Sequence, residues 1–461
     1  MPASDQHFDR SIVDGPLPAA VWKLAWPTML QNMVMGLQGL VDHALVGHFV
    51  GYTANAAIGV SWQIFLLVIV FTSSLYIGMS VLVSRHVGAG DAGSVNRVVS
   101  QAFLVSFGLS LFVLAPAGYL LAPSLLDLVN AAPEVKAEAL PFLRIMFVFS
   151  LGMLVFFLLG GAFRAAGDAR TPLHLGIALT VLNVAFNVVF IRGLGPIPGL
   201  GTKGAAIGTV TANALVAMAG AWLLFGNRSV IRLSTRMNWR PDPAIIRPLF
   251  RFGLPAGFQG VAMNVAGVLL LRYIGSLDHS AAAQAAYAVG YTELFSFITW
   301  TSVGLMGATA TVAGQNLGAG RPDRSARGAF VAARFGLALA VTIGVVFLAI
   351  PRQLYAGFGL TEPLVVGIGV ELLQYLSISG LFITVALAYT GGLQGSGDTR
   401  SPFFISVISQ IVVPIGTCAI ASSLWHLEPH HVWRAIVLGH ITRSVLTVLR
   451  FRQGRWRQIH V

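Results

Sequence analysis

The chain has 461 residues, of which 56% are apolar and only 10% are charged, and its mean hydropathy is +0.77. A soluble protein of this length would need far more charge to cover its surface, so the composition excludes that class. The net charge of +12 does not indicate a nucleic-acid-binding protein, because the basic residues form no patch with interleaved aromatic residues.

Apolar blocks follow one another along the chain, and several approach or exceed the roughly 20 residues that cross a bilayer as a helix. Examples are residues 60–83, 173–191 and 205–225. The blocks and the breakers between them predict an all-α membrane protein with twelve transmembrane helices. The expected starts are Trp22, Asn55, Val95, Glu138, Thr171, Lys203, Phe250, Ala283, Gly328, Val366, Ser401 and His430.

Arginine and lysine residues are distributed unevenly between the predicted spans. The loops after spans 2, 4, 6, 8 and 10, together with the residues after span 12, hold eighteen of them, whereas the opposite loops and helix ends hold seven. Because positive residues stay on the cytoplasmic side, the sequence predicts a multi-pass protein of the cell (inner) membrane with both termini in the cytoplasm.

Three sequence features recur about half a chain apart. Residues 167–172 (Gly-Asp-Ala-Arg-Thr-Pro) return as residues 397–402 (Gly-Asp-Thr-Arg-Ser-Pro), and Gly-Ala-Gly at 88–90 returns at 318–320, both at an offset of 230. Pro27 and Gln31 are answered by Pro255 and Gln259 at an offset of 228. These matches predict that the chain is one unit duplicated and fused.

Six spans per repeat would bring both halves into the membrane in the same orientation. This predicts two six-helix bundles related by a pseudo-two-fold axis along the membrane normal, an arrangement that suits alternating access. The expected parts are a cytoplasmic N-terminal tail (1–16), a first half (17–226), a basic cytoplasmic linker (227–249), a second half (250–452) and a cytoplasmic tail (453–461).

The repeated Gly-Asp-x-Arg-[Thr/Ser]-Pro turns each end one predicted helix and begin the next. Glycine stops a helix, and Thr or Ser followed by Pro suits the N-cap and the first helical position. Asp168 with Arg170, and Asp398 with Arg400, are expected to pair across their turns. Each turn is either a tight cytoplasmic hairpin alone or also part of a gate between the halves.

Asp42 is an acidic residue inside the first predicted span. Gln31, Met35, Gln38 and Asp42 follow one helical stripe, so the carboxylate shares a face with two amides. An ionised carboxylate in a membrane helix costs about 2.5–3.5 kcal/mol and by default marks an ion or proton pathway. The alternative is a hydrated, structural Asp near the membrane interface.

Asn183 and Asn187 are four residues apart in the fifth predicted span and share one face, and Thr211 lies in the next span. Their neutral oxygens suit a hard cation such as sodium, or hydrogen bonds to Asp42. The alternative is interhelical hydrogen bonding alone, worth about 0.6 kcal/mol per contact.

The second half carries an intramembrane acid of its own, Glu293. It is a candidate for a second proton site or a counter-charge for a cationic substrate, and the alternative is a simple pair with a nearby polar group. The other polar candidates of this half are Gln259, Asn264 and Tyr291. Because Leu270 occupies the repeat position of Asp42, ion chemistry is expected mainly in the first half.

Methionine and aromatic side chains in the predicted spans suit a permissive pocket, although such residues more often face lipid or pack the core. The candidates are Met33, Met35, Phe65, Phe71, Phe258, Met263, Tyr287, Tyr291, Phe295 and Trp300.

Several motifs stand in a distinctive order over nearly the whole chain. They are Trp26-Pro27, Val41-Asp42, Gly88-Ala89-Gly90, Arg164 through Pro172, Asn183 with Asn187, Gly204-Ala205-Ala206 and residues 314–320 (Gly-Gln-Asn-Leu-Gly-Ala-Gly). In this order the chain resembles the MATE family, multidrug and toxic compound extrusion transporters, within a larger superfamily of polysaccharide and lipid flippases.

The resemblance implies a secondary exporter that expels organic, often cationic and amphipathic compounds against an inward flow of Na⁺ or H⁺. It also implies a coupling-ion role for the acid at position 42. Some branches of the family carry an Asp where Asn187 stands, so this chain has one charge fewer there.

We therefore expect an antiporter driven by H⁺ or Na⁺, with no enzyme activity, metal or cofactor, because nucleotide-binding, nucleophile and zinc motifs are missing from the sequence. The expected partners are the lipid bilayer and drug-like small molecules rather than nucleic acid, and a monomer is expected to function. The alternative is a flippase or exporter of an endogenous lipid-linked or conjugated metabolite. Arginines would line the cleft of a flippase for anionic carriers, whereas here almost every Arg lies in a loop or at a helix end.

Overall fold

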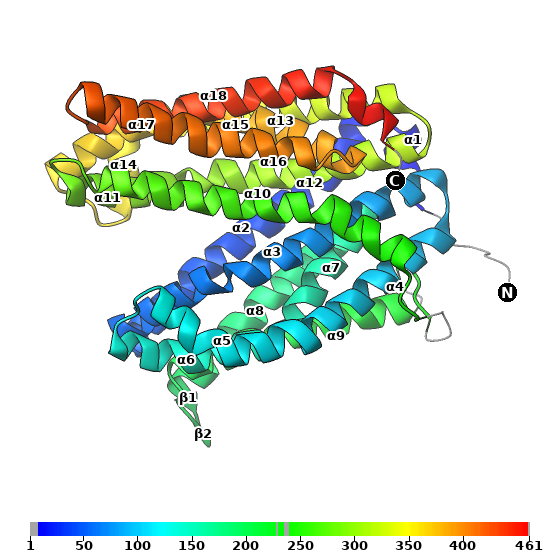
Figure 1. The fold of residues 1–461 in the computed structure, drawn as a ribbon, viewed down its shortest axis with the longest axis horizontal. Helices are drawn as coiled ribbons and strands as arrows, with labels where there is room; N and C mark the ends of the chain where they lie inside the picture. The colour runs from blue at the N-terminus through cyan, green and yellow to red at the C-terminus, as the bar shows by residue number, and fades with distance from the viewer. Residues whose placement is uncertain (1–7, 227–228, 235–238, 460–461) are drawn as a thin grey trace. The chain divides into compact units, whose positions relative to one another are not determined.

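The computed structural model describes residues 8–226, 229–234 and 239–459, apart from a few side chains within helices. These residues are almost entirely helical (Figure 1). The first half contains α1 (Ser11–Asp14), α2 (Leu17–Phe49), α3 (Tyr52–Ala89), α4 (Ala92–Leu109), η1 (Ser110–Leu114), α5 (Ala115–Leu128), α6 (Pro133–Val148), α7 (Leu151–Ala165), α8 (Arg170–Arg192), the hairpin strands β1 (Gly193–Leu194) and β2 (Ile197–Pro198), and α9 (Thr202–Phe225). The second half contains α10 (Pro243–Ile274), α11 (Ser280–Tyr287), η2 (Ala288–Leu294), α12 (Ser296–Gly318), α13 (Pro322–Ala349), α14 (Pro351–Gly357), α15 (Pro363–Ser396), α16 (Arg400–Val407), η3 (Ile408–Val412), α17 (Val413–Leu424), α18 (Pro429–Arg452) and η4 (Arg455–Gln458).

The helices account for the twelve predicted spans. Within the described residues, nine helical segments are long and apolar enough to cross a membrane, and the pair α6 and α7, bent by 52°, makes a tenth. The remaining long helices, α2 and α3, have 33 and 38 residues, well above the roughly 20 that a bilayer requires. The largest shift from a predicted start is at α10, which begins at Pro243 rather than Phe250.

Three spans contain a π-helical stretch, in which the hydrogen bonds skip one residue further than in an α-helix. These stretches are η1 in the span Ala92–Leu128, η2 in Ser280–Gly318 and η3 in Arg400–Leu424. Stretches of this kind often lie at functional sites. The hydropathy pattern that predicts the spans contains no signal for them.

The chain divides into two compact units, and the boundaries after Met29 and after Gly257 fall inside helices. Unit 1 comprises Leu30–Gly257, and unit 2 comprises Arg10–Met29 and Phe258–Val461. The start of α2 belongs to unit 2 because Gly304 of α12 lets Met29 approach; a Cβ at Gly304 would lie 2.7 Å from the Met29 nitrogen. The start of α10 belongs to unit 1 because Gly253 lies directly against Ser74 of α3. The domain limits set from the sequence at residues 17–226 and 250–452 stay predictions.

The duplication is visible in side-chain contacts within each unit. In unit 1, Gln31 Oε1 accepts a hydrogen bond from Arg164 Nη1 at 3.0 Å. In unit 2, the repeat partner Gln259 accepts from Gln394 Nε2 at 3.1 Å and donates to Ser406 Oγ at 2.8 Å. Position 394 follows position 164 at the repeat offset, so both halves use one contact to join corresponding helices.

The repeated glycines adopt the left-handed backbone conformation that ends helices. Gly90 and Gly320 have φ of 77° and 72°, and Gly167 and Gly397 have φ of 99° and 96°. Other residues adopt such angles only with strain, which explains why glycine stands at these turns in both halves.

Each repeated aspartate caps the helix that follows it. Asp168 accepts hydrogen bonds from the backbone NH of Thr171 at 3.0 Å and from its hydroxyl at 2.5 Å. Asp398 accepts the same pair from Ser401, at 3.2 and 2.9 Å. The aspartate, rather than the Thr or Ser after it, thus satisfies the free NH groups at the helix start.

The expected pairing of each Asp with the Arg of its own turn is wrong. Among the described residues, the contact of Arg170 with Asp168 is a hydrogen bond from its backbone NH at 3.0 Å, not an ion pair from its guanidinium. Asp398 pairs instead with Arg450 of α18, at 2.9 and 3.0 Å. The physical reason is that Arg170 and Arg400 begin the following helices with exposed side chains, while the helix NH groups occupy the carboxylate.

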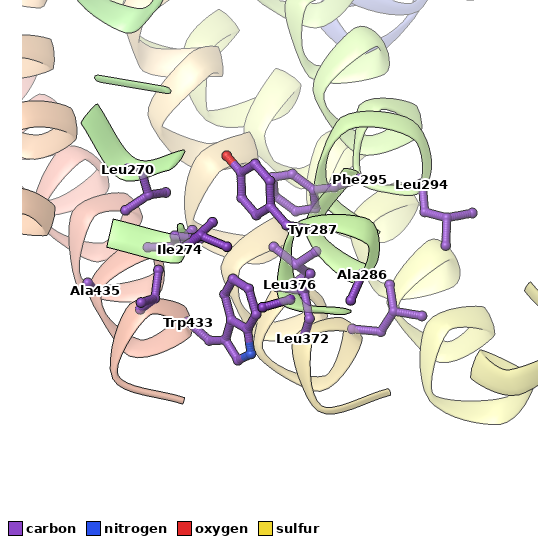
Figure 2. Close-up of a cluster of buried hydrophobic side chains, with 14 of the residues drawn as sticks. Leu270, Ile274, Ala286, Tyr287, Leu294, Phe295, Leu372, Leu376, Trp433 and Ala435 are labelled. Atoms are coloured by element: carbon purple, nitrogen blue, oxygen red, sulfur yellow. The ribbon is translucent and has the colours of Figure 1, made fainter. Parts of the chain in front are cut away.

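Each unit has its own apolar core. In unit 1 the core includes Phe65 and Phe147, whose ring centroids are 5.4 Å apart. In unit 2 the largest cluster gathers around Tyr287, which stacks on Trp433 with 6.2 Å between ring centroids (Figure 2). Leu270, the repeat counterpart of Asp42, lies in this cluster at 7% exposure. The position that carries an acid in unit 1 therefore serves packing in unit 2.

The two capping aspartates allow a matched stability test. Asp168→Ala removes a helix cap, which is worth about 1 kcal/mol and, for a unit of this size, about 2–4 °C in Tm. Asp398→Ala removes the same cap and also leaves Arg450 without its ion pair, so we expect a Tm decrease about twice as large. Thermal unfolding of the purified protein in detergent measures both. Arg450→Gln should reproduce the extra loss, and equal decreases for the two alanine variants would contradict this account.

Candidate functional site

A cavity of about 500 Å³ lies inside unit 1. It is lined by residues of α2, α3, α7, α8 and α9. They are Met35, Gln38, Gly39, Asp42, Ile58, Trp62, Thr72, Ser73, Tyr76, Met153, Phe156, Phe157, Leu179, Thr209 and Asn213. The cavity therefore combines one carboxylate with a largely apolar and aromatic wall, and it has the size of a small-molecule site.

The acid of the cavity wall is hydrogen-bonded to an asparagine from another helix. Asn187 Nδ2 of α8 donates to Asp42 Oδ1 of α2 at 2.9 Å. The same amide nitrogen donates to Asn183 Oδ1, one turn back on α8, at 3.1 Å. Asn183 and Asn187 are almost fully buried, with exposures of 0% and 1%, whereas Asp42 is half-buried. The polar stripe of the first span, which carries Asp42, thus contacts the Asn183 and Asn187 face of α8.

The hydrogen-bonded chain continues onto α9 through Thr209. Asn183 Nδ2 donates to Thr209 Oγ1 at 3.1 Å, and Asn213 Nδ2 donates to the Thr209 backbone carbonyl at 2.9 Å. The structure thus places Thr209, not the predicted Thr211, in the cluster. Two residues along an α-helix turn the side chain by about 200°, so Thr211 lies on the opposite face. The sequence offers both threonines, and only the rotation of α9 selects one.

The glutamines of the α2 stripe hold neighbouring helices. Gln38 lines the cavity and accepts a hydrogen bond from Thr180 Oγ1 of α8 at 2.9 Å. Gln31 lies one to two turns earlier and accepts from Arg164, whose guanidinium also lies 5.5 Å from the ring centroid of Tyr76. Tyr76 lines the cavity, so Arg164 contacts a residue of the cavity wall without lining the cavity itself.

One polar atom of the cluster is buried without a hydrogen bond. Among the described residues, no partner is found for Asn187 Oδ1. The oxygen lies against Gly208 of α9, where a Cβ would approach it to 2.2 Å. An unsatisfied buried acceptor costs about 1–3 kcal/mol, so this amide is held in a state that an added ligand or a reorientation would improve.

The apolar candidates of the sequence have different places. Met35 lies in the cavity wall, while Phe65, Tyr287 and Phe295 are buried in the two cores. The side chain of Phe71 lies outside the described residues. The ring surface of the cavity comes from aromatic residues that the sequence does not single out, namely Trp62, Tyr76, Phe156 and Phe157.

The second-half candidates have different surroundings in the described part of unit 2. Gln259 is buried in the contact with Gln394 and Ser406. Asn264 is exposed and donates to the Gly260 carbonyl one turn back, at 2.9 Å. Tyr291 and Glu293 both lie in the π-helical stretch η2, with Tyr291 stacked on Tyr287 at 5.0 Å between ring centroids.

A buried arginine in unit 2 is missing from the sequence prediction. Arg443 of α18 is 1% exposed, and its Nη1 lies 3.8 Å from Met263 Sδ. Among the described residues it forms no ion pair. One turn earlier, His440 is hydrogen-bonded to Ser379 and stacks on Phe295. The signal was the position of Arg443 well inside a span, which the sorting of basic residues by loop overlooks.

Known proteins resemble this chain along almost its whole length. It is 26% identical to a probable multidrug resistance protein NorM of Thermotoga maritima, over 95% of this chain and 92% of that protein. A probable multidrug resistance protein NorM of Deinococcus radiodurans is 28% identical, over 95% of this chain and 96% of its own length.

Solved structures share the fold. One is described as the outward-facing conformation of a multidrug resistance MATE family transporter of the MOP superfamily; it matches with a TM-score of 0.90 at 20% identity, over 97% of this chain and 98% of that one. A second is a MOP superfamily transporter from Pyrococcus furiosus, with a TM-score of 0.88 at 20% identity over 97% and 98% of the chains. Its description attributes to it a binding pocket of reverse polarity and suggests a different function.

The family model MatE matches residues 27–189 and residues 255–420. These two stretches together cover more than half of the chain and repeat one module, as the internal sequence matches predict. The match of the family model over most of the chain shows that the chain belongs to the MATE family of membrane transporters, and the helical spans and the duplicated contacts agree with this.

Proposed function

We propose that the protein is an ion-coupled multidrug efflux transporter, in which Asp42 binds the coupling H⁺ or Na⁺ and the cavity of unit 1 takes part in binding organic cations. The observation that carries the proposal is the bond from Asn187 to Asp42 in the wall of an aromatic cavity. The names of the NorM relatives, multidrug resistance proteins, support the substrate class.

The electrostatics of Asp42 favour an exchangeable positive charge. A carboxylate inside a membrane span is costly while it is ionised, at about 2.5–3.5 kcal/mol. The amide of Asn187 is neutral, so its hydrogen bond orients the carboxylate without cancelling its charge. A proton, a sodium ion or a cationic substrate each brings a positive charge that this carboxylate attracts.

The preferred orientation of the Asn187 amide depends on whether Asp42 has bound a proton or a cation. Its nitrogen now faces two oxygens, Asp42 Oδ1 at 2.9 Å and Asn183 Oδ1 at 3.1 Å, while its own oxygen lacks a partner. Reversal of the amide would turn three oxygens toward one point. That arrangement is favourable only if Asp42 carries a proton to donate or a cation lies between the oxygens, which are ligands that hard cations prefer.

The cavity wall suits amphipathic cations of varied shape. Met35 and Met153 adapt to different apolar surfaces, and the faces of Trp62 and Tyr76 attract positive charge. An organic cation and the coupling ion would both be drawn to Asp42, so binding of one disfavours the other. Competition of this kind is sufficient for antiport when the ion and the substrate prefer different conformations.

We also propose the finer topology as part of this function: both termini in the cytoplasm, the inner membrane as the location, and a monomer as the working form. The support is the excess of basic residues in alternate loops, eighteen against seven.

Removal of the Asp42 charge should abolish coupling. We expect Asp42→Asn to lose at least nine-tenths of the efflux of a fluorescent organic cation from reconstituted vesicles, because the substitution removes the carboxylate from the cavity wall. The measurement imposes a pH gradient and a sodium gradient in turn, and the gradient that drives the unsubstituted protein identifies its coupling ion. Asp278→Asn, which removes the same charge from a side chain 70% exposed, is the matched control. Normal efflux by correctly folded Asp42→Asn would refute the mechanism.

Substitution of Asn187 should separate hydrogen bonding from charge. Asn187→Leu removes the hydrogen bond to Asp42. We expect efflux to fall about tenfold, which corresponds to the roughly 1.4 kcal/mol that one strong hydrogen bond contributes.

Asn187→Asp places a second carboxylate about 3 Å from Asp42, where both cannot stay ionised without a cation. It should therefore retain efflux and change its dependence on pH or on sodium concentration. An unchanged profile in Asn187→Asp would show that this position does not contact the ion.

Arg443 supports a second candidate function, the export of an endogenous anionic or conjugated metabolite. A buried guanidinium that forms no ion pair among the described residues is a natural partner for phosphate or carboxylate. The related P. furiosus transporter, described as having a pocket of reverse polarity, supports variation of this kind within the fold.

The two candidates differ in their response to loss of the Arg443 charge. If the protein exports organic cations, Arg443→Gln should leave the efflux of a cationic dye within about twofold, provided that thermal unfolding shows a folded protein. If it exports an anionic conjugate, the same variant should reduce transport of an anionic dye at least tenfold. Transport of an anionic dye by the unsubstituted protein, with no transport of the cationic dye, would replace the first proposal by the second.

A further inference from the structure

The residues after the last span fold back as an ordered element of unit 2. Helix α18 ends at Arg452, and Gly454, with φ of 72°, turns the chain into η4. Trp456 of η4 is 1% exposed, stacks on Phe451 with 4.7 Å between ring centroids, and donates from Nε1 to the Phe451 carbonyl at 2.7 Å. This anchor packs in a small cluster with Leu317, Ala329 and Leu393.

A cavity of about 640 Å³ opens beside this anchor. Its lining combines arginines, glutamines and aromatic rings: Ala326, Tyr389, Phe451, Arg452, Gln453, Gly454, Arg455, Trp456, Arg457 and Gln458. The rings of Tyr389 and Phe451 contact each other edge to face, with 5.1 Å between centroids. The cavity therefore has an aromatic wall and a rim of hydrogen-bond donors.

The charges at the rim are only partly compensated. Arg457 pairs with Asp323 at 3.1 Å, and Arg450 pairs with Asp398. Arg452 and Arg455 are exposed, and within the described part of the chain neither forms an ion pair. Two guanidinium groups thus stand at one cavity without a carboxylate, although the chain pairs the arginines on either side of them.

We propose that this cavity binds the headgroup of an anionic phospholipid, through Arg452 and Arg455. Guanidinium groups bind phosphate with paired hydrogen bonds, and the glutamines offer further donors. The cavity lies where the span Pro429–Arg452 ends, and arginines with tryptophan and tyrosine at the end of a span are typical of the membrane interface. Of the three rings in the lining, Tyr389 is partly exposed and would contact the glycerol region of the lipid, which a free anion would leave uncovered.

The test measures lipid-dependent stability of the full-length protein in a neutral detergent. We expect added phosphatidylglycerol to raise the Tm by at least 3 °C, whereas phosphatidylcholine and inorganic phosphate each raise it by less than 1 °C. Arg452→Gln/Arg455→Gln should lose at least two-thirds of the phosphatidylglycerol effect. The side chains are exposed, so the double variant is expected to fold, and its Tm without lipid verifies this.

The control removes the same charge from two exposed arginines elsewhere, Arg97 of α4 and Arg327 of α13. Arg97 and Arg327 are exposed repeat partners outside the cavity, and Arg97→Gln/Arg327→Gln should keep the full lipid effect. Native mass spectrometry gives a second readout, with the number of retained phosphatidylglycerol molecules falling by one in the cavity variant only. The proposal is overturned if the cavity variant keeps the shift, if the control loses it equally, or if inorganic phosphate alone reproduces it.

Discussion

The hydrogen bond from Asn187 to Asp42 is the interaction on which the arrangement of unit 1 depends. It joins α2 to α8 at a point where one partner is charged and the surroundings are apolar. Bringing α9 to the same point requires Gly208, since any side chain there would overlap the Asn187 oxygen. The network then reaches Thr209 through Asn183, so three helices are fixed by amides and a hydroxyl. A network of this kind fixes the orientation of the carboxylate in the cavity wall.

The features that both units share are helix ends and helix contacts, whereas the acid at position 42 occurs in unit 1 alone. The positive-φ glycines, the capping aspartates and the glutamine contacts occur in both units. The first two shape helix ends and the third joins neighbouring helices, and both copies need these features. Asp42 has no such counterpart: its repeat position, Leu270, is part of the apolar core of unit 2 (Figure 2). Asp398 differs from Asp168 in the same way, since only the second copy has an arginine, Arg450, that reaches it.

The sequence predicts the spans, the repeat and the two ends of the Asp42–Asn187 contact, because hydropathy and helical spacing depend on local order along the chain. It does not choose between Thr209 and Thr211, because the rotation of α9 about its axis is decided by packing. The π-helical stretches are missed because the spans are predicted from their mean hydropathy, which one extra residue in a turn leaves almost unchanged. Arg443 is missed because a rule that sorts basic residues by loop gives no place to one buried in a span.

The two units carry interior charges of different kinds, and this bears on which of them can respond to an ion. A guanidinium stays charged in proteins, so Arg443 gives unit 2 a fixed positive charge that neither a proton nor sodium alters. A carboxylate changes its charge by taking up a proton and changes its surroundings by binding a cation. Any ion-dependent step in unit 2 must therefore involve an acid such as Glu293, whereas unit 1 has in Asp42 an acid, an adjacent reorientable amide and a cavity together. In the mechanism we propose, coupling therefore belongs to unit 1, and the fixed charge of unit 2 bears on the sign of the substrate.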